Sequence, residues 1–428
     1  MDHNVSLLDQ TVDSPMLPAR NAVLEKARQK LSRIGYLSGA PRVSTRQDAE
    51  SGGPRSHVLG VMAAFRSLGY DLHPFIVGDQ MPPEVTRRSG RAISATVAHA
   101  LAADIGRLSF RLINARRAWR HLGDRVDWVY ERFSACQALG RNFQRHGIPW
   151  ILETNGPFYE EAKAERKSMV LTGLARRLEL DAYRRCDVLV CVSPTLRDIV
   201  CAEAGIDPSK VVVVPNGVDT DLFNPQRHVP KRVFEGFTIG FVGGLLAWQG
   251  LDLLLHALAE LRDEQGLPIH LVVVGDGLAR KAWTALADEL KLTERVTFVG
   301  RVNGDEVPSY IAGFDLGYSG QVQLQSGSMY HSPLKIYEYM AMGKAVLASA
   351  FDDAKRIIEE GETGFLFSPA DKKDLKRALA AAYQARGRAT LMGQAARSEI
   401  VAHHSWTARV SFMAGQIAAL LNSRQPIV

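Results

Sequence analysis

The chain has 428 residues, of which 46% are hydrophobic and 23% charged, and its formal net charge is +6. This length suits two domains, and the composition is in the range of a soluble globular protein. No apolar run could span a bilayer, and the first thirty residues lack a signal-peptide core. The cysteines have neither metal-site spacing nor disulfide density. We therefore expect a reduced, cytoplasmic protein. The four cysteines are Cys136, Cys186, Cys191 and Cys201.

Residues 1–32 are mixed and polar, and we expect them to form a flexible N-terminal tail. The regular pattern begins at 33–39, which predicts a short buried strand. A polar loop with Gly52-Gly53 separates it from a helix predicted over 56–68 and a strand over 72–77. A strand, a helix and a second strand in succession predict a parallel sheet.

Residues 87–125 carry much of the excess positive charge. Apolar residues such as Ile105, Leu108, Leu112 and Ile113 alternate there with arginines. The pattern is typical of a basic amphipathic helix, which can make peripheral contact with the inner face of a membrane. The alternative is a solvated helix whose apolar side packs on its own domain. No nucleic-acid-binding motif is present, so we expect no nucleic acid partner. The arginines are Arg87, Arg88, Arg91, Arg107, Arg111, Arg116, Arg117, Arg120 and Arg125.

The first domain is predicted over 33–216 and ends where Pro215-Asn216-Gly217 breaks the pattern. Before that break, short apolar strands alternate with helices. The strands are expected near 128–130, 150–152, 188–192 and 211–214, and the helices near 174–185 and 195–203.

The same alternation restarts and predicts a second domain over 217–405. A last helix over 406–424 is expected to pack back on the first domain. The architecture is therefore α/β, with two facing Rossmann-like domains and an interdomain cleft, because ligands bind beyond the carboxyl ends of parallel strands. No G-x-G-x-x-G after a strand and no phosphate-binding loop motif occurs, which disfavours a nicotinamide enzyme or an NTPase. Strands are expected over 238–242, 270–274, 295–299, 314–318, 345–349 and 365–367, and helices over 250–262, 278–290, 305–312, 353–360, 371–385 and 388–402.

The most informative stretch is 332–343, Ser-Pro-Leu-Lys-Ile-Tyr-Glu-Tyr-Met-Ala-Met-Gly. Ser332 is expected to cap a helix that Gly343 ends. Lys335 and Glu338 share one face near its start. Free N–H groups and a lysine suit a diphosphate, and a carboxylate one turn deeper suits a ribose diol. The alternative is an ordinary helix with an i,i+3 ion pair.

Five stretches together resemble the retaining glycosyltransferases of family 4, which have the GT-B fold. The resemblance covers about residues 33–410. The stretches are Val192-Ser193, Val214-Pro215-Asn216-Gly217-Val218-Asp219, Gly275-Asp276-Gly277, Phe298-Val299-Gly300 and 332–343.

The resemblance implies that the second domain binds a nucleotide-sugar donor and the first binds an acceptor. Glu338 matches the second glutamate of the family's E-x7-E motif, which binds the ribose, whereas the first falls at Tyr330. The family's Arg and Lys for the diphosphate are replaced by Gly244 and Gln249, so Lys335 is the cation that remains. The implied donor-binding residues are Gly53, Gly243, Gly244, Gln249, Gly275, Arg301, Val302, Tyr330, Ser332, Pro333, Leu334, Lys335 and Glu338.

In the first domain, Glu131, Arg132, Glu153 and Asn155 follow or end strands and resemble the family's reaction-centre loops. Glu131, Arg132 and Asn155 are expected on the acceptor side. Asn155 or Glu153 would orient the acceptor hydroxyl or the donor sugar, which gives a catalytic set of Lys335, Glu338, Asn155 and Glu153. The alternative makes Glu131–Arg132 a structural ion pair and Asn155 a turn residue. His57 is interpreted as a helix-face residue rather than a base.

The resemblance implies transfer with retention, in which a phosphate oxygen takes the acceptor proton. No cofactor or metal is expected, because Asp219-Thr220-Asp221 lies in a linker and suits a turn. We expect a UDP-sugar donor and a sugar, lipid-linked or small-molecule acceptor, in polysaccharide or glycoconjugate biosynthesis. The alternatives are a natural-product glycosyltransferase, a GT-B epimerase or phosphorylase, and an inactive nucleotide-sugar-binding protein.

Overall fold

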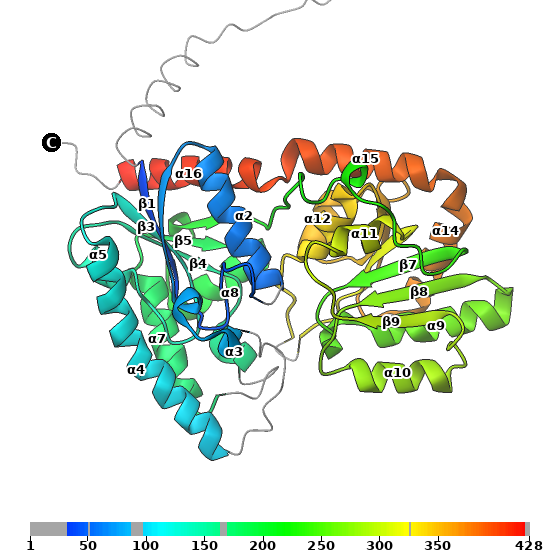
Figure 1. The fold of residues 1–428 in the computed structure, drawn as a ribbon, viewed down its shortest axis with the longest axis horizontal. Coiled ribbons are helices and arrows are strands. Elements are labelled where there is room, and N and C mark those ends of the chain that lie inside the picture. The colour runs from blue at the N-terminus through cyan, green and yellow to red at the C-terminus, as the bar shows by residue number, and fades with distance from the viewer. Residues whose placement is uncertain (1–31, 50–51, 87–96, 163–168, 325–326, 424–428) are drawn as a thin grey trace, which may run out of the picture.

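Each half of the chain forms one six-stranded parallel sheet with helices on its faces (Figure 1). The computed structural model describes residues 32–49, 52–86, 97–162, 169–324 and 327–423. Residues 1–31 of the predicted tail and residues 87–96 of the basic segment lie outside these ranges.

The first sheet has the strand order β2-β1-β3-β4-β5-β6. Its strands are buried on both faces, as parallel sheets are, and therefore consist mainly of continuous apolar residues. The strands are β1 Arg33–Ser38, β2 Asp71–Ile76, β3 Trp128–Arg132, β4 Trp150–Thr154, β5 Val188–Cys191 and β6 Val211–Val213. The helices are α2 Gly53–Ser67, α3 Pro83–Thr86, α4 Val97–Leu122, α5 Arg141–Gln144, α6 Phe158–Glu160, α7 Thr172–Arg185 and α8 Pro194–Ala204.

The second sheet has the order β12-β11-β10-β7-β8-β9, the doubly wound arrangement in which the chain starts at the centre and fills one side before the other. The strands are β7 Phe237–Val242, β8 Ile269–Val274, β9 Val296–Gly300, β10 Leu316–Ser319, β11 Ala345–Ser349 and β12 Gly364–Phe367. The helices are α9 Leu251–Gln265, α10 Arg280–Glu289, α11 Val307–Ala312, α12 Leu334–Ala341, α13 Asp352–Ile357, α14 Lys372–Gln384, α15 Ala389–His403 and α16 Trp406–Ser423.

The chain crosses between the two domains after β6 and again before α16, and the two crossings lie side by side. Val218 accepts a backbone hydrogen bond from Trp406 and donates one to the carbonyl of His404. Helix α16 then packs on the first domain, where Trp406 and Val410 share a core cluster with Val58 of α2 (Figure 1). The last helix of the chain is therefore part of the core of the first domain.

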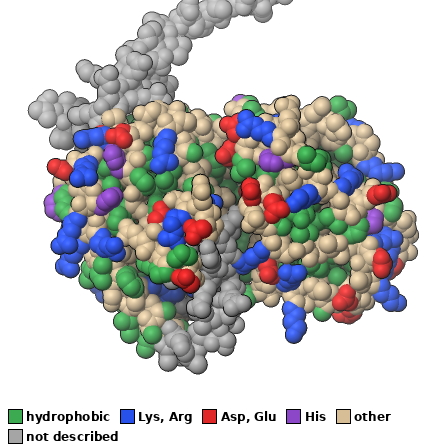
Figure 2. Space-filling view, in the orientation of Figure 1, with side chains coloured by type: hydrophobic (Ala, Val, Ile, Leu, Met, Phe, Trp, Pro, Cys, Tyr) green, Lys and Arg blue, Asp and Glu red, His purple; other side chains and the backbone are tan. Residues whose placement is uncertain are grey.

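Helix α4 packs one side on the first domain and leaves apolar side chains on the other side. Asp104, Asn114, Ala118 and Leu122 are buried. The exposed fractions are 55% for Ile105, 51% for Phe110, 61% for Leu112 and 47% for Ile113. Figure 2 shows hydrophobic side chains over the lower part of this region and Lys and Arg side chains above them. The surface of α4 is thus both apolar and basic.

Several helix boundaries differ from the sequence prediction by a few residues, and for α2 and α13 the structure shows a local reason. Helix α2 starts at Gly53 instead of residue 56, because Gly52 accepts the first backbone hydrogen bonds and Pro54 suits the first turn. Helix α13 ends at Ile357 rather than 360, since Ile358 has an extended backbone that ends the helical pattern.

Candidate functional site

The tip of α12 is where the two domains meet. Pro333 occupies the position before the helix, and no side chain caps the helix start. The prediction that Ser332 caps it is wrong: the Ser332 hydroxyl donates to Asp353 and accepts from the backbone N–H of Asn216. Gly343 follows the helix with a φ of 67°, which confirms the predicted stop.

Lys335 is buried, with an exposed fraction of 7%. Its Nζ donates to Gln249 Oε1 at 2.6 Å and lies 3.9 Å from the centroid of the Phe241 ring. Burial lowers the pKa of the Lys335 ammonium to about 7, against the opposing effect of the Glu338 carboxylate. Lys335 and its neutral partner Gln249, both predicted for the donor, therefore lie in contact.

Glu338 lies one turn deeper and is only partly exposed. Burial raises the pKa of its carboxyl group to about 7, and the nearby charge of Lys335 opposes that rise. The two groups thus act on each other electrostatically, as their i,i+3 spacing predicts. Each is held in an environment that disfavours its charged form.

The predicted glycine turns line up beside Lys335. A Cβ built on Gly243 would lie 3.4 Å from Lys335 Nζ, and one on Gly275 would lie 1.9 Å from the Gly243 carbonyl oxygen. Both glycines have positive φ, of 140° and 135°. Gly244 is exposed and has open space beside it. Backbone at this edge can approach a ligand closely, because no side chain intervenes.

The start of α2 brings the first domain next to the start of α12. A Cβ on Gly53 would lie 3.5 Å from the Leu334 side chain, so the starts of α2 and α12 adjoin. Leu334 packs against the core cluster of the first domain rather than that of its own domain. Gly53 and Leu334 therefore belong to the interdomain contact, and Pro333 directly precedes Leu334.

Tyr330 points into the first domain. Its ring is buried in that domain's core cluster, and its hydroxyl donates to Glu161 at 3.2 Å. His331 Nε2 lies 3.4 Å from the same carboxylate, and the His331 ring stacks on Trp248 with 5.0 Å between centroids. At the position of the family's first glutamate, this chain therefore makes an interdomain contact.

Arg301 and Val302, predicted near a nucleobase, follow β9. Arg301 is exposed, and Val302 packs on the core of the second domain. Arg280, which the sequence did not single out, has Nη1 3.2 Å from the point where a Cβ on Gly300 would lie.

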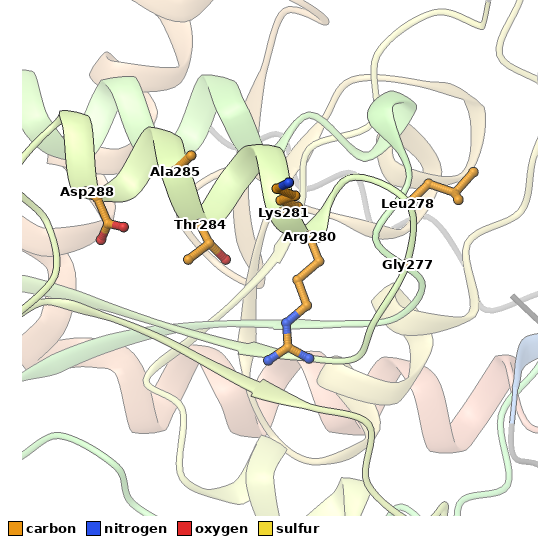
Figure 3. A pocket seen from close by; sticks show the side chains of 7 residues that line it. All are labelled: Gly277, Leu278, Arg280, Lys281, Thr284, Ala285 and Asp288. Atoms are coloured by element: carbon orange, nitrogen blue, oxygen red, sulfur yellow. The ribbon is translucent and has the colours of Figure 1, made fainter. Parts of the chain in front are cut away.

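A hollow of about 510 Å³ opens beside this region, at the start of α10. Figure 3 shows Arg280 extending towards the strands and Leu278 pointing away from the helix. None of the donor residues predicted from the sequence is among the described residues that line it, which are Gly277, Leu278, Arg280, Lys281, Thr284, Ala285 and Asp288.

Glu153 is buried at the end of β4, with an exposed fraction of 1%. Its Oε2 accepts from the Tyr130 hydroxyl at 2.7 Å, and its Oε1 accepts from Asn155 Nδ2 at 2.6 Å. Burial alone would raise its pKa, but the neighbouring His57 and Arg132 lower the pKa to about 2. Glu153 is therefore ionised and holds Asn155 in place.

Arg132 and Glu131 have separate partners, so the alternative of a Glu131–Arg132 ion pair is wrong. Arg132 donates to Asn155 Oδ1 at 2.7 Å. Glu131 is fully buried and accepts from the backbone N–H groups of Leu139 and Gly140, and burial raises its pKa to about 7. Glu131 supports a loop in this structure and does not line an accessible surface, which revises its predicted place on the acceptor side.

His57 is buried, with an exposed fraction of 5%. It contacts both Asn216, which holds Ser332, and Glu153, which holds Asn155. Its Nδ1 lies 2.8 Å from Asn216 Oδ1, and its Nε2 lies 2.7 Å from Glu153 Oε1. The interpretation of His57 as an ordinary helix-face residue missed this contact, because Glu153 and Asn216 are far away in sequence.

Asp219 confirms its expected role in a turn. Its Oδ1 accepts from the backbone N–H groups of Asp221 and Leu222 at 3.0 and 2.9 Å. Within the described ranges, no three His, Cys, Asp or Glu side chains are grouped so that they could hold a metal ion. None of the helices in the same ranges is long and apolar enough to cross a bilayer.

Two families of known proteins match the two domains. The family described as Glycosyltransferase Family 4 matches residues 51–222, and the family described as Glycosyl transferases group 1 matches residues 236–385.

Relatives match over part of the chain. Mannosylfructose-phosphate synthase of Agrobacterium fabrum is 26% identical over 210 residues, which are 46% of this chain and 45% of the relative. The GDP-mannose-dependent alpha-(1-6)-phosphatidylinositol monomannoside mannosyltransferase of Mycolicibacterium smegmatis is 27% identical over 58% of this chain and 66% of its own length. The chain thus spans 45% of the length of the first of these relatives and 66% of the length of the second.

Solved structures share the two-domain fold along nearly the whole chain. Sucrose-phosphate synthase from Thermosynechococcus elongatus aligns with a TM-score of 0.67 at 17% identity and covers 91% of this chain and 100% of its own. Anabaena HepE in complex with UDP-glucose aligns with a TM-score of 0.62 at 17% identity and covers 90% and 99%.

Proposed function

The chain belongs to glycosyltransferase family 4, and from this premise we propose that it transfers a sugar from a nucleotide-sugar donor to an acceptor hydroxyl. The donor occupies the second domain around the start of α12. The acceptor occupies the first domain near Asn155 and Arg132. The alternatives are an epimerase or phosphorylase of the same fold and a protein that binds the donor without turnover.

The observation that carries the proposal is the buried ammonium of Lys335. Its hydrogen-bond partner is the neutral Gln249, and no carboxylate of the described residues forms an ion pair with it. A buried charge is unfavourable unless an opposite charge accompanies it. A diphosphate beside the Gly243–Gly244 turn would supply that charge. Glu338 would then accept the ribose hydroxyls.

This arrangement supports catalysis by stabilising the leaving group. Breaking the bond between sugar and phosphate develops negative charge on the diphosphate. Preorganised donors around such a charge are usually the largest single contribution to catalysis. Lys335 and the backbone N–H of Gly244 are the donors that we assign to this role, since the Gly243 N–H already donates to the Val274 carbonyl.

We further propose that transfer occurs with retention and requires no metal. The support is family membership and the position of Lys335 where a metal ion would otherwise neutralise the diphosphate. Asn155 would orient the acceptor hydroxyl, because Glu153 and Arg132 fix both ends of its amide. Glu153 would act through Asn155 as a positioning residue.

For the donor we propose a UDP-sugar. The support is the UDP-glucose bound to the structurally similar HepE, whereas a mycobacterial relative is named as GDP-mannose-dependent. The test is a thermal-shift screen of UDP-, GDP-, dTDP- and ADP-sugars, since a bound ligand raises the unfolding temperature. We expect a UDP-sugar to give the largest rise.

Activity is then measured with that donor and a panel of acceptors. Lys335→Ala and Glu338→Ala should each abolish the thermal shift and sugar transfer, whereas Lys344→Ala, at the far end of α12, should retain both. Unchanged transfer in the first two variants would refute the site. Donor binding without turnover would favour the inactive alternative, and dependence on inorganic phosphate would favour a phosphorylase.

For the acceptor we propose a lipid-linked molecule at an anionic membrane surface. The support is the surface of α4, where Ile105 and Leu112 are exposed and Arg116, Arg117 and Arg120 are exposed on the following turns. A helix with apolar and basic residues on its free side binds anionic lipid by both kinds of contact.

A further inference from the structure

A continuous set of polar contacts joins the donor side of the site to the acceptor side. It starts in the second domain, where Ser332 lies directly before α12. Asn216, in the segment between the domains, donates its Nδ2 to the Ser332 carbonyl at 2.5 Å and its backbone N–H to the Ser332 hydroxyl at 2.9 Å. The Asn216 Oδ1 then contacts His57 of α2. His57 contacts Glu153, which holds Asn155.

The direction of these contacts fixes the protons on His57. Because the Asn216 Nδ2 faces a carbonyl oxygen, its Oδ1 faces His57 and can only accept a hydrogen bond. The Nδ1 of His57 must therefore carry a proton. An ionised Glu153 is likewise only an acceptor, and it lies 2.7 Å from Nε2. Nε2 has no aligned hydrogen bond but lies within ion-pair distance of the carboxylate, so a proton on Nε2 would make this contact an ion pair.

The groups around the ring are consistent with a cation. Glu153 on β4 supplies a negative charge, and the Tyr130 hydroxyl on β3 donates to that same carboxylate. Helix α16 presents the edge of the Trp406 ring, with centroids 4.9 Å apart, and Arg409 lines the same small cavity. The Arg409 guanidinium hydrogen-bonds to His404.

We propose that His57 is a doubly protonated positioning residue which, through Asn216, fixes the start of α12 relative to the loop that carries Asn155. The ion pair orients Glu153 and hence the Asn155 amide. The Asn216 contacts hold Ser332, three residues before Lys335. His57 thus sets the geometry between the leaving-group site and the acceptor site, and it touches neither substrate.

The charge of His57 is tested by NMR of the full chain with 15N-labelled histidine near neutral pH. We expect both ring nitrogens of His57 to be protonated, with the signals assigned from their loss in His57→Gln. In Glu153→Gln the ring should become neutral and keep only the Nδ1 proton. Trp406→Phe, which alters the same packing but leaves Asn216 and Glu153 in place, should retain both protons. An unprotonated ring nitrogen in the wild type would overturn the proposal.

The positioning role rests on the proposed function and is tested by kinetics. His57→Gln and Asn216→Ala should each lower kcat by at least about tenfold, because small displacements of reacting groups are costly, with donor and acceptor KM changed less than about threefold. The double variant should be no worse than the worse single variant, since either change breaks the same contact. Trp406→Phe should lose stability but keep its kcat.

Additive losses, or a kcat for His57→Gln equal to that of Trp406→Phe, would reduce His57 to a packing role. If the wild type transfers sugar from no donor, the proposed function fails. The NMR result still decides the charge of His57 in that case.

Discussion

Lys335 is a buried lysine whose hydrogen-bond partner, Gln249, carries no charge. Its ammonium is surrounded by an aromatic ring, an amide oxygen and glycine backbone, and burial lowers its pKa to about 7. A depressed lysine pKa means that the folded protein binds fewer protons than the unfolded chain at alkaline pH. At alkaline pH, Lys335 must therefore take up a proton when a diphosphate binds beside it.

We predict proton uptake on donor binding. At about pH 8, a group with a pKa of about 7 is mostly neutral, so UDP binding should take up about 0.9 proton. Calorimetric titration of UDP in buffers of different ionisation enthalpy measures this number. Lys335→Gln should abolish the uptake. Lys344→Gln, which removes another lysine whose pKa is lowered by burial, should leave it unchanged. Uptake that persists in Lys335→Gln would assign the proton elsewhere.

Glu153 gives a second prediction, which concerns how the stability of the protein depends on pH. Its pKa is about 2 in the folded protein, against a reference value of 4.5, so its contribution to stability is present above pH 4.5 and is lost as the pH falls towards 2. The shift corresponds to about 3 kcal/mol. Urea unfolding of the wild type and of Glu153→Gln should therefore differ more at about pH 6 than at about pH 3.

Asp127→Asn is the matched control for this measurement. Asp127 also has a lowered pKa, but it pairs with Arg33 in a solvent-exposed ion pair, where screening keeps the contribution small. An equally large effect in both variants would contradict the account of Glu153 as a buried, paired carboxylate.

At the scale of elements, the periodic segments were predictable and the contacts between them were not. Strands β8 and β11 each contain a run of apolar residues, 271–274 and 345–348, and α12 has its apolar residues at helical spacing and a glycine stop. Local sequence dictates these features. Ser332 and His57 both contact Asn216 in the segment between the domains, and Tyr330 contacts Glu161 of the other domain. Only tertiary packing brings them together.

In the candidate site, too, some features follow from local sequence and others depend on tertiary packing. The proximity of Lys335 and Glu338 follows from one helix turn, and the approach of Gly243 follows from strand-end geometry. By contrast, burial decides whether a carboxylate can meet a substrate. Glu131 and Glu153 look alike in sequence, yet one holds a backbone loop and the other an asparagine side chain.

Helix α4 carries a prediction of its own. Flotation with phosphatidylglycerol vesicles should recover the protein, and added salt should weaken the recovery, because arginine contacts with lipid are screened. The double variant Ile105→Glu/Leu112→Glu should reduce the partition coefficient by at least about tenfold, since two apolar side chains no longer enter the lipid.

Leu391→Glu provides the comparison for the vesicle experiment. Leu391 lies on α15 of the second domain and is as exposed as Leu112, at 64% and 61%. The Leu391→Glu variant should be recovered with the vesicles to the same extent as the wild type. Equal loss in both variants would show general repulsion by added negative charge rather than docking through α4.

At the scale of the whole molecule, the two domains share residues at their boundary. Ser193 donates to the Tyr330 carbonyl at 2.7 Å, and Thr195 donates to Asp352 at 2.6 Å. Trp406, the first residue of α16, packs on Gly60 and Gly217, where a Cβ would collide with or crowd its ring. The end of the chain thus contributes to the stability of its beginning.

We therefore predict that Trp406→Ala destabilises the first domain by about 3 kcal/mol, as expected for truncation of a large buried aromatic residue. Urea unfolding followed by hydrogen exchange should show faster exchange in β5 and β6, while the amides of β8 keep their protection. Phe412→Ala on the same helix is the control, because Phe412 is 54% exposed. Uniform loss of protection in both sheets would indicate that the domains unfold as one unit.

The return of α16 also determines the order in which the protein matures on the ribosome. The six strands of the first sheet have all been synthesised by residue 213, but the helix that covers Val58, Val190 and Val212 is made some two hundred residues later. The second domain, encoded in between, can complete itself earlier. The domain that is translated first is thus the last to bury its core, because this apolar face stays uncovered until α16 has been made.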